Sequence, residues 1–262
     1  MKIDLYQVDA FTGQVFGGNP AAVCPLTAWP SDFLLQSIAA ENNLAETAFF
    51  VPQGSRFELR WFTPAAEIDL CGHATLATAH VIFRHLHYPR DEVHFQTRFA
   101  GSLSARRDGD WITLDLPSWA AKAAEIPEAA VVGLNGMRPQ ECYLRRDYMF
   151  VYSTEEEIRT VQPDYSQLMK LGRDLCITAP GRDCDFVSRF FNAADESGED
   201  PVTGSAHSML IPYWAKRLGK SALMAKQLSK RQGELKCQLL GERVLLSGQA
   251  QTYMCGQIQL PD

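Results

Sequence analysis

The segment DLCGHATLA, residues 69–77, places a thiol (Cys71), a glycine (Gly72) and an imidazole (His73) at the start of an alanine-rich, apolar stretch. An imidazole can transfer protons near neutral pH, and a thiol at a helix N-terminus can become reactive. The glycine lets a helix begin there, and the first backbone N–H groups of a helix attract anions. The combination indicates acid/base chemistry on an anionic molecule, although a glycine before a helix also marks a simple tight turn.

A second segment of the chain repeats this pattern. At an offset of 132 residues, TGSAH (residues 203–207) aligns with CGHAT (residues 71–75). The same offset, without a gap, aligns further identical or similar residues: Gly101 with Gly233, Leu103 with Leu235, Gly109 with Gly241, Asp110 with Glu242, and Leu114 with Leu246. The chain therefore contains an internal repeat, and Gly204 takes the place of Gly72 at the start of a second helix.

Each half of the chain is expected to contain a short helix, a longer helix and several strands. In the first half, the hydrophobic pattern predicts helices at 32–42 and 73–86, and strands at 2–9, 46–51, 56–63, 92–98, 101–107 and 111–116. The longer helix is apolar around much of its circumference, so it should be buried on most sides. This indicates a buried central helix wrapped by strands in each half.

The repeat predicts two domains, at 1–118 and 132–250, followed by a C-terminal strand or tail at 251–262. The tract at 117–139 is the natural linker. With two facing domains, the cleft between them is the default ligand site. We expect the helix starts at Gly72 and Gly204 to hold a carboxylate-bearing substrate there.

The overall composition narrows the class of function. The chain has 262 residues, 46% hydrophobic content and a net charge of −6, which predicts a globular protein that does not bind nucleic acid. Its seven cysteines form no CxxC pair, as is typical of reduced thiols in the cytoplasm. The longest uncharged run, residues 10–31, is broken by glycines and prolines, so neither a membrane segment nor a secretion signal is expected.

The sequence contains no recognisable motif for a nucleotide cofactor or a metal site. No glycine-rich nucleotide-binding motif follows a predicted strand. The histidines that follow the first-half helix start (His80, His85, His87 and His94) have no cysteine or carboxylate partner at metal-ligand spacing. We therefore predict no cofactor and no metal.

Four motifs, taken in order, resemble the PhzF-like isomerase family, a relative of diaminopimelate epimerase. They are FGGNPAAV (residues 16–23), LAETAFF (44–50), DLCGHATLA (69–77) and GEDPVTGSAH (198–207). The resemblance implies an α+β fold of two pseudo-symmetric domains, each a mostly antiparallel, β-barrel-like sheet around a central helix. It also implies a homodimer, a biosynthetic role and catalysis without a cofactor.

The resemblance assigns roles to individual positions of this sequence. The catalytic residues it implies are Glu46, as the acid/base group, with His73, Asp200 and Ser205. The substrate-binding residues it implies are Gly18, Asn19, Gly72 and Gly204. Taken alone, Glu46 would be an ordinary residue at a strand start, and Asp200 before Pro201 would simply open a turn.

These residue types suit an isomerase that transfers a proton on a small carboxylate-bearing metabolite. A proton shift needs one group that removes the proton and returns it elsewhere, and a carboxylate between apolar neighbours can serve. Two alternatives stay open. One is an amino-acid racemase or epimerase that uses Cys71 as a base, although its counterpart in the repeat, Thr203, is a hydroxyl that cannot be the second base. The other is a non-catalytic small-molecule-binding protein.

Overall fold

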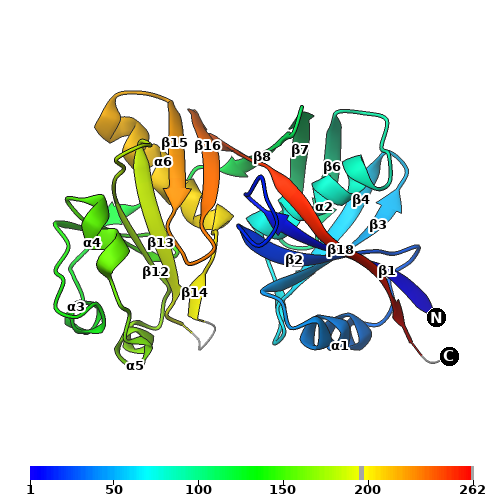
Figure 1. Cartoon of the computed structure of the whole chain (residues 1–262), viewed down its shortest axis with the longest axis horizontal. Helices are drawn as coiled ribbons and strands as arrows, with labels where there is room; N and C mark the ends of the chain where they lie inside the picture. The colour runs from blue at the N-terminus through cyan, green and yellow to red at the C-terminus, as the bar shows by residue number, and fades with distance from the viewer. Residues whose placement is uncertain (195–197, 261–262) are drawn as a thin grey trace. The chain divides into compact units, whose positions relative to one another are not determined.

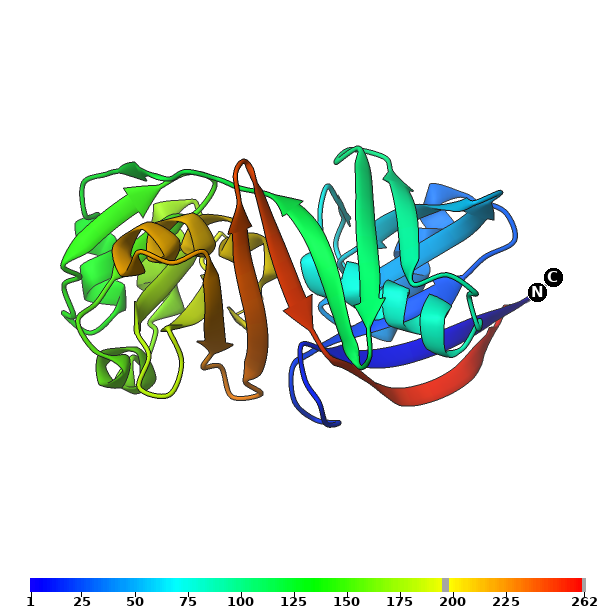
Figure 2. The ribbon, with the colours of Figure 1, turned by 90° about the horizontal axis from the view of Figure 1, so that it is seen from above.

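The computed structural model describes residues 1–194 and 198–260 of the chain. These fall into two compact units: unit 1 holds Met1–Leu116 and Leu246–Asp262, and unit 2 holds Pro117–Leu245. The sequence-predicted ranges differ from these units mainly at the end of the chain. There the last strand, β18 (Ala250–Gln259), pairs antiparallel with β1 (Lys2–Ala10) and so belongs to unit 1. Figure 2 shows the two strands side by side.

Unit 1 contains two helices, of which the second is the longer. The helices are α1 (Asp32–Asn42) and α2 (Gly72–Arg84). Besides β1 and β18, the strands are β2 (Asn19–Pro25), β3 (Glu46–Gln53), β4 (Arg56–Phe62), β5 (Glu67–Ile68), β6 (Glu92–Thr97), β7 (Ser102–Asp108) and β8 (Trp111–Pro117), whose last residue falls in unit 2.

Unit 2 repeats this composition with additional short helices. The helices are α3 (Glu128–Gly133), α4 (Glu155–Thr160), α5 (Tyr165–Leu168), the 3-10 turn η1 (Met169–Leu171) and α6 (Gly204–Leu218). The strands are β9 (Lys122–Ala123), β10 (Glu141–Leu144), β11 (Tyr148–Val151), β12 (Leu175–Pro180), β13 (Phe186–Asn192), β14 (Gly198–Asp200), β15 (Ala222–Gln227), β16 (Gly233–Leu240) and β17 (Arg243–Gly248), which ends in unit 1.

Strand pairing follows the same scheme in the two units. In unit 1, β2 runs parallel to β3, β3 antiparallel to β4, β4 parallel to β6, and β6 antiparallel to β7. In unit 2, β11 runs parallel to β12, β12 antiparallel to β13, β13 parallel to β15, and β15 antiparallel to β16. This correspondence confirms that the repeat in the sequence is a repeat of topology.

The longer helix of each unit is buried against its own sheet (Figure 1). In α2, every residue except His80 and Arg84 is buried, as expected for a helix apolar on most sides. The counterpart α6 has nine buried residues and ends at Gly219, whose left-handed backbone closes the helix. The predicted α+β fold, with a central helix within a mostly antiparallel sheet, is confirmed.

One strand of unit 1, β2, is not among the strands predicted from the sequence. β2 carries Pro20 near its start and Pro25 at its end, and proline lacks the N–H that a central strand needs. The structure nevertheless pairs β2 with β1 on one side and β3 on the other. The strand matters for function because its first residue is Asn19.

Across the described residues, we find no helix with the length and apolar character that a membrane crossing requires.

Candidate active site

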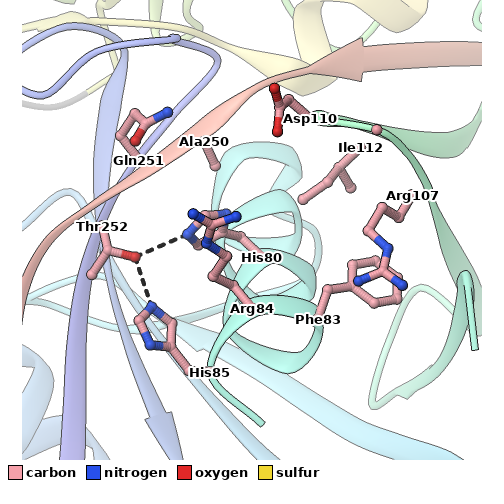
Figure 3. A pocket seen from close by; sticks show the side chains of 11 residues that line it. His80, Phe83, Arg84, His85, Arg107, Asp110, Ile112, Ala250, Gln251 and Thr252 are labelled. Carbon is pink, nitrogen blue, oxygen red and sulfur yellow. Dashed lines mark hydrogen bonds between the residues drawn. The ribbon is translucent and has the colours of Figure 1, made fainter. Parts of the chain in front are cut away.

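The central helix of unit 1 has polar side chains at both ends, and the C-terminal end borders a cavity of about 800 Å³ (Figure 3). Here Nε2 of His80 lies 2.9 Å, and Nε2 of His85 lies 2.8 Å, from the same hydroxyl, Oγ1 of Thr252. Burial, together with the nearby charges of His85 and Arg84, lowers the pKa of His80 to about 4, so its imidazole is neutral at neutral pH. These histidines tie α2 to β18.

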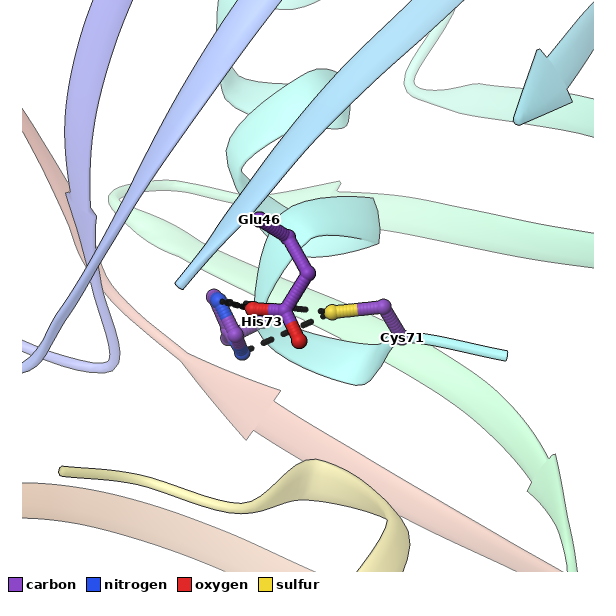
Figure 4. Close-up of side chains that lie close together, drawn as sticks. All are labelled: Glu46, Cys71 and His73. Carbon is purple, nitrogen blue, oxygen red and sulfur yellow. Dashed lines mark hydrogen bonds and ion pairs between the residues drawn. The ribbon is translucent and has the colours of Figure 1, made fainter. Parts of the chain in front are cut away.

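The N-terminal end of α2 carries the residues that the sequence singled out. Glu46 is the first residue of β3, and His73 is the second residue of α2. Their side chains meet, with Nε2 of His73 2.9 Å from Oε2 of Glu46 (Figure 4). The His73 side chain is 4% exposed and that of Glu46 is 16% exposed, so the pair is shielded from water on most sides.

Asn19 fixes the other side of the same imidazole. Its side-chain amide is fully buried and lies 3.1 Å from Nδ1 of His73. The amide nitrogen can donate to a neutral ring, and a flipped amide would offer its oxygen to a charged one. Asn19, predicted to bind substrate, therefore also positions His73.

Gly18 is required by the backbone that delivers Asn19. Its φ of +58° lies in the left-handed region, and a Cβ atom there would stand 2.0 Å from the carbonyl oxygen of Ala10. Only glycine fits such a close approach without moving β1. The predicted binding role of Gly18 thus coincides with a structural need.

Cys71 completes the cluster at the start of α2. Its thiol lies 3.5 Å from Nδ1 of His73, within the range of a weak sulfur contact. Burial raises the pKa of the Cys71 thiol, and the neighbouring Glu46 raises it further, so the thiol is protonated at neutral pH. A protonated thiol is a poor base.

The pKa of His73 is also raised, but in a histidine this shift favours the charged form. Burial disfavours a charged imidazole, but the carboxylate of Glu46 and the contacts of the ring with Glu46 and Cys71 outweigh it and hold the pKa of His73 well above its usual value. This shift favours the imidazolium form of His73, paired with Glu46. A buried cation beside a carboxylate provides a proton and a positive charge at one place.

The partial positive charge at the N-terminus of α2 is not offset by an acidic residue in the first turn of the helix. Cys71 is the N-cap residue and makes no side-chain capping hydrogen bond, and the first turn contains no acidic residue. The buried Gly72 follows at the first helical position. Such a terminus attracts a negative group through its N–H groups and dipole.

In unit 2, the half-buried, predicted residue Asp200 belongs to a polar network with two buried residues, Thr203 and Gln227. Thr203, the N-cap of α6, donates its hydroxyl to Oδ2 of Asp200. Gln227 holds both residues: its Nε2 donates to the Asp200 carbonyl at 2.8 Å, and its Oε1 accepts from the Thr203 N–H at 2.9 Å. Sequence reasoning missed Gln227, because a glutamine on a strand carries no motif.

Ser205 and Gly204 occupy the first turn of α6. The Ser205 side chain is half-buried, so it is partly exposed to solvent. As in α2, the N-cap side chain of α6 makes no capping hydrogen bond and no acidic residue lies in the first turn. The hydroxyl is available to a ligand.

The structure thus brings three predicted residues into direct contact, namely Asn19, Glu46 and His73, with Gly18 and Gly72 beside them in the chain. Asp200, Gly204 and Ser205 lie together in unit 2, around the start of α6. Their catalytic and binding roles remain predictions.

Comparison with known proteins shows the relationship of the chain. The family model of the phenazine biosynthesis-like proteins, PhzC-PhzF, matches residues 8–256. The chain belongs to the PhzC-PhzF family. The family predicted from the four motifs is confirmed.

Relatives of this PhzC-PhzF protein share its whole length. An uncharacterised isomerase of Pseudomonas aeruginosa is 47% identical over 261 residues, covering 99% of this chain and 100% of the relative. The crystal structure of a PhzF-family protein from Enterococcus faecalis superposes with a TM-score of 0.95 at 43% identity, covering 99% of this chain and 100% of that one. The enzyme class predicted from the sequence, isomerase, is confirmed.

The fold extends beyond the PhzC-PhzF family. A hydroxyproline epimerase from Agrobacterium vitis, crystallised with trans-4-hydroxy-L-proline, gives a TM-score of 0.64 at 10% identity, covering 100% of this chain and 93% of that one. At this identity the likeness shows the shared fold alone.

Proposed function

We propose that this isomerase moves a proton on a small carboxylate-bearing metabolite with its own side chains and without a cofactor. Glu46 is the group that removes and returns the proton. One observation supports this above the others: Oε2 of Glu46 lies 2.9 Å from His73 Nε2, which holds the carboxylate beside the start of α2. The Glu46 side chain is 16% exposed, which leaves the carboxylate accessible to a substrate.

The proton transfer proceeds in two steps. Oε1 of Glu46 takes a proton from a carbon next to, or conjugated with, the substrate carboxylate, and the electron pair of the C–H bond delocalises toward that carboxylate. Glu46 then returns the proton, either to another carbon, which moves the double bond, or to the same carbon. The His73 imidazolium stays beside Glu46 and offsets the negative charge.

The helix start at Gly72 is proposed to bind the substrate carboxylate. The dipole at this helix terminus and the absence of acidic residues in the first turn of α2 support this. Asp200, Ser205 and Gly204 are proposed to act in the same reaction, on the strength of the family motif that carries them. Their test is mutation, with Asp200→Asn and Ser205→Ala expected to lower turnover.

Solvent deuterium incorporation tests the proposal without knowing the substrate. A panel of cyclic and amino-acid carboxylates is incubated with the protein in deuterated buffer and read by mass spectrometry. The wild type should exchange at least one compound, and Glu46→Gln should reduce the rate by about 10²–10⁴-fold.

A matched control is available on β6. Glu92 also faces a histidine, with Oε1 3.7 Å from Nε2 of His94, but both side chains are about half exposed. Glu92→Gln should leave exchange unchanged. Exchange that survives in Glu46→Gln would overturn the proposed role of Glu46.

One specific observation favours a second candidate function. The thiol of Cys71 stands 3.5 Å from Nδ1 of His73, so a racemase or epimerase could use it as a base. Its raised pKa and the hydroxyl of Thr203 at the repeated position argue against this. Loss of exchange in Cys71→Ser, with Glu46→Gln tolerated, would favour the racemase.

The third alternative, a non-catalytic binding protein, is disfavoured by isomerase relatives.

The wider setting is proposed from the family alone. We propose a homodimer that acts in a biosynthetic process in the cytoplasm. Analytical ultracentrifugation of the full chain tests the first point, since a monomer at working concentration would contradict it.

A further inference from the structure

Three different metal-binding groups converge at the start of α2. The carboxylate of Glu46, the thiol of Cys71 and the imidazole of His73 each contribute one atom, and these atoms lie within 4.8 Å of one another. Figure 4 shows the three side chains pointing toward one another, from β3, from the N-cap residue of α2 and from the first turn of α2. No other set of three such residues meets this condition in the described parts of the chain.

The distances between these groups are close to those around a small tetrahedral cation. Zinc binds nitrogen at about 2.0–2.1 Å, sulfur at about 2.3 Å and carboxylate oxygen at about 2.0–2.2 Å, so two ligands on one ion stand roughly 3.3–3.6 Å apart. Here His73 Nε2 is 2.9 Å from Glu46 Oε2 and 4.0 Å from Cys71 Sγ. The sulfur also lies 3.5 Å from Nδ1 of the same ring, so the Cys71 and His73 side chains must adjust to bring all three groups to one ion.

The chemistry of the donors selects the kind of cation. A thiolate with an imidazole favours zinc and similar borderline ions over magnesium or calcium, which prefer oxygen. His73 and Cys71 are 3% and 5% exposed, so a bound ion would be largely shielded from water, with Glu46 as the more exposed of its ligands. Three protein ligands leave a fourth position for water or a substrate carboxylate.

We propose that Glu46, Cys71 and His73 form an inhibitory site for a thiophilic divalent cation such as zinc. On binding, the Cys71 thiol and the His73 imidazolium each release one proton, the sulfur and the ring nitrogen each form a bond to the ion, and no electron is transferred. The inhibition rests on the proposed function, because the ion occupies the carboxylate that would otherwise move the substrate proton. The sequence alone predicted no metal here.

Cobalt(II) is the probe for this site, because a bound thiolate gives it a charge-transfer band in the near ultraviolet. Cobalt chloride is titrated into the full-length wild-type protein, and zinc chloride is then added as a competitor. The wild type should develop the band at one equivalent and lose it to zinc. Cys71→Ser should show no band, whereas Cys255→Ser, which removes an exposed thiol, should keep it.

A second variant covers the case in which Cys71→Ser does not fold. Glu46→Gln retains the thiol but loses the carboxylate ligand, and should weaken cobalt binding by at least about tenfold. Glu92→Gln should bind as the wild type does. A wild type without the band, or a band that persists in Cys71→Ser, would overturn the proposal.

The metal result is separable from the catalytic one. Cobalt binding is read without turnover, so a band in a protein that exchanges no proton would support the metal site and reject the proposed function. Exchange in a protein that develops no cobalt band would support the proposed function and reject the metal site. Where both occur, zinc should inhibit exchange in the wild type and in Cys255→Ser alike, and exchange unaffected by saturating zinc would overturn the inhibitory role.

Discussion

Nε2 of His73 lies 2.9 Å from Oε2 of Glu46, and the opposite nitrogen of the same ring faces the buried amide of Asn19 at 3.1 Å. The imidazole is therefore held between side chains from two different strands, β2 and β3. A ring fixed at both nitrogens has one orientation, so the placement of the Glu46 carboxylate beside it depends on Asn19 as well.

Replacing Asn19 by alanine should disturb catalysis through His73. We expect deuterium exchange to fall by about tenfold to a hundredfold, because the imidazole loses its second anchor. The unfolding free energy should fall by about 1–3 kcal/mol, since a buried polar group loses its partner. A positioning role also predicts a changed pH profile of the exchange rate, measured from pH 5 to 9.

The control for this variant is Asn42, whose half-buried amide donates to Thr47 Oγ1 at 3.1 Å. Asn42→Ala should cost stability without changing the pH profile of exchange. Equal effects on exchange from both variants would show that Asn19 acts only through stability.

Replacing Cys71 by alanine should separate the two candidate functions. The raised pKa keeps this thiol protonated, so if Glu46 is the base, exchange should fall by less than about tenfold. Loss of a general base would cost about 10²–10⁴-fold instead. Exchange rates of Cys71→Ala and Cys255→Ala, measured side by side on the same compound, decide between the two, and a loss confined to Cys71→Ala would favour the racemase.

Replacing Gln227 by alanine should disrupt unit 2 at the start of α6. Its side chain is fully buried and bonds both Asp200 and Thr203, so the variant leaves buried polar groups without partners. We expect a loss of about 1–3 kcal/mol in unfolding free energy, measured by urea denaturation. Gln238→Ala, on the exposed face of β16, should change it by less than about 0.5 kcal/mol. Equal stability of the two variants would contradict the network.

Stability should fall when the pH drops from about 6.5 to 4. Burial lowers the pKa of His207 to about 4, as burial and nearby charges do for His80. An unfolded histidine titrates at about 6.5, so in this window the unfolded chain binds protons that the folded chain does not. Each histidine should therefore cost up to about 1.4 kcal/mol per pH unit as the pH falls.

Urea denaturation at several pH values measures this slope. His80→Gln and His207→Gln should each make it shallower, whereas His94→Gln, whose side chain is 52% exposed, should not. A slope that is identical in the wild type and both buried-site variants would rule out these two histidines as its source.

Replacing Gly18 by alanine should destabilise the loop that carries Asn19. The new Cβ would meet the Ala10 carbonyl, whereas at Gly54, with a similar φ of +61°, nothing lies within 4 Å. Both variants bear the cost of a left-handed backbone, but only Gly18→Ala adds the clash, so it should lose about 1–3 kcal/mol more in urea denaturation. Equal losses would show that the loop moves freely.

The sequence alone was enough to predict the repeat, the buried central helices and the family. Apolar periodicity decides which face of a helix or strand is buried, and the paired matches at one offset report a duplicated topology. The sequence was insufficient to predict β2, because the prolines of this segment argue against a central strand until its pairing with the neighbouring strands is known. It also gave no signal for Gln227, which acts through contacts 24 and 27 residues away.

Sequence motifs placed Glu46 and His73 among the catalytic candidates, but their roles there came from resemblance. Only the tertiary structure decided that they form an ion pair, that Asn19 holds the same ring, and that Cys71 shares the site with a raised pKa. The physical reason is that these properties depend on distance and burial. Both are set when β2, β3 and α2 pack together, and neither is encoded in the spacing of residues along the chain.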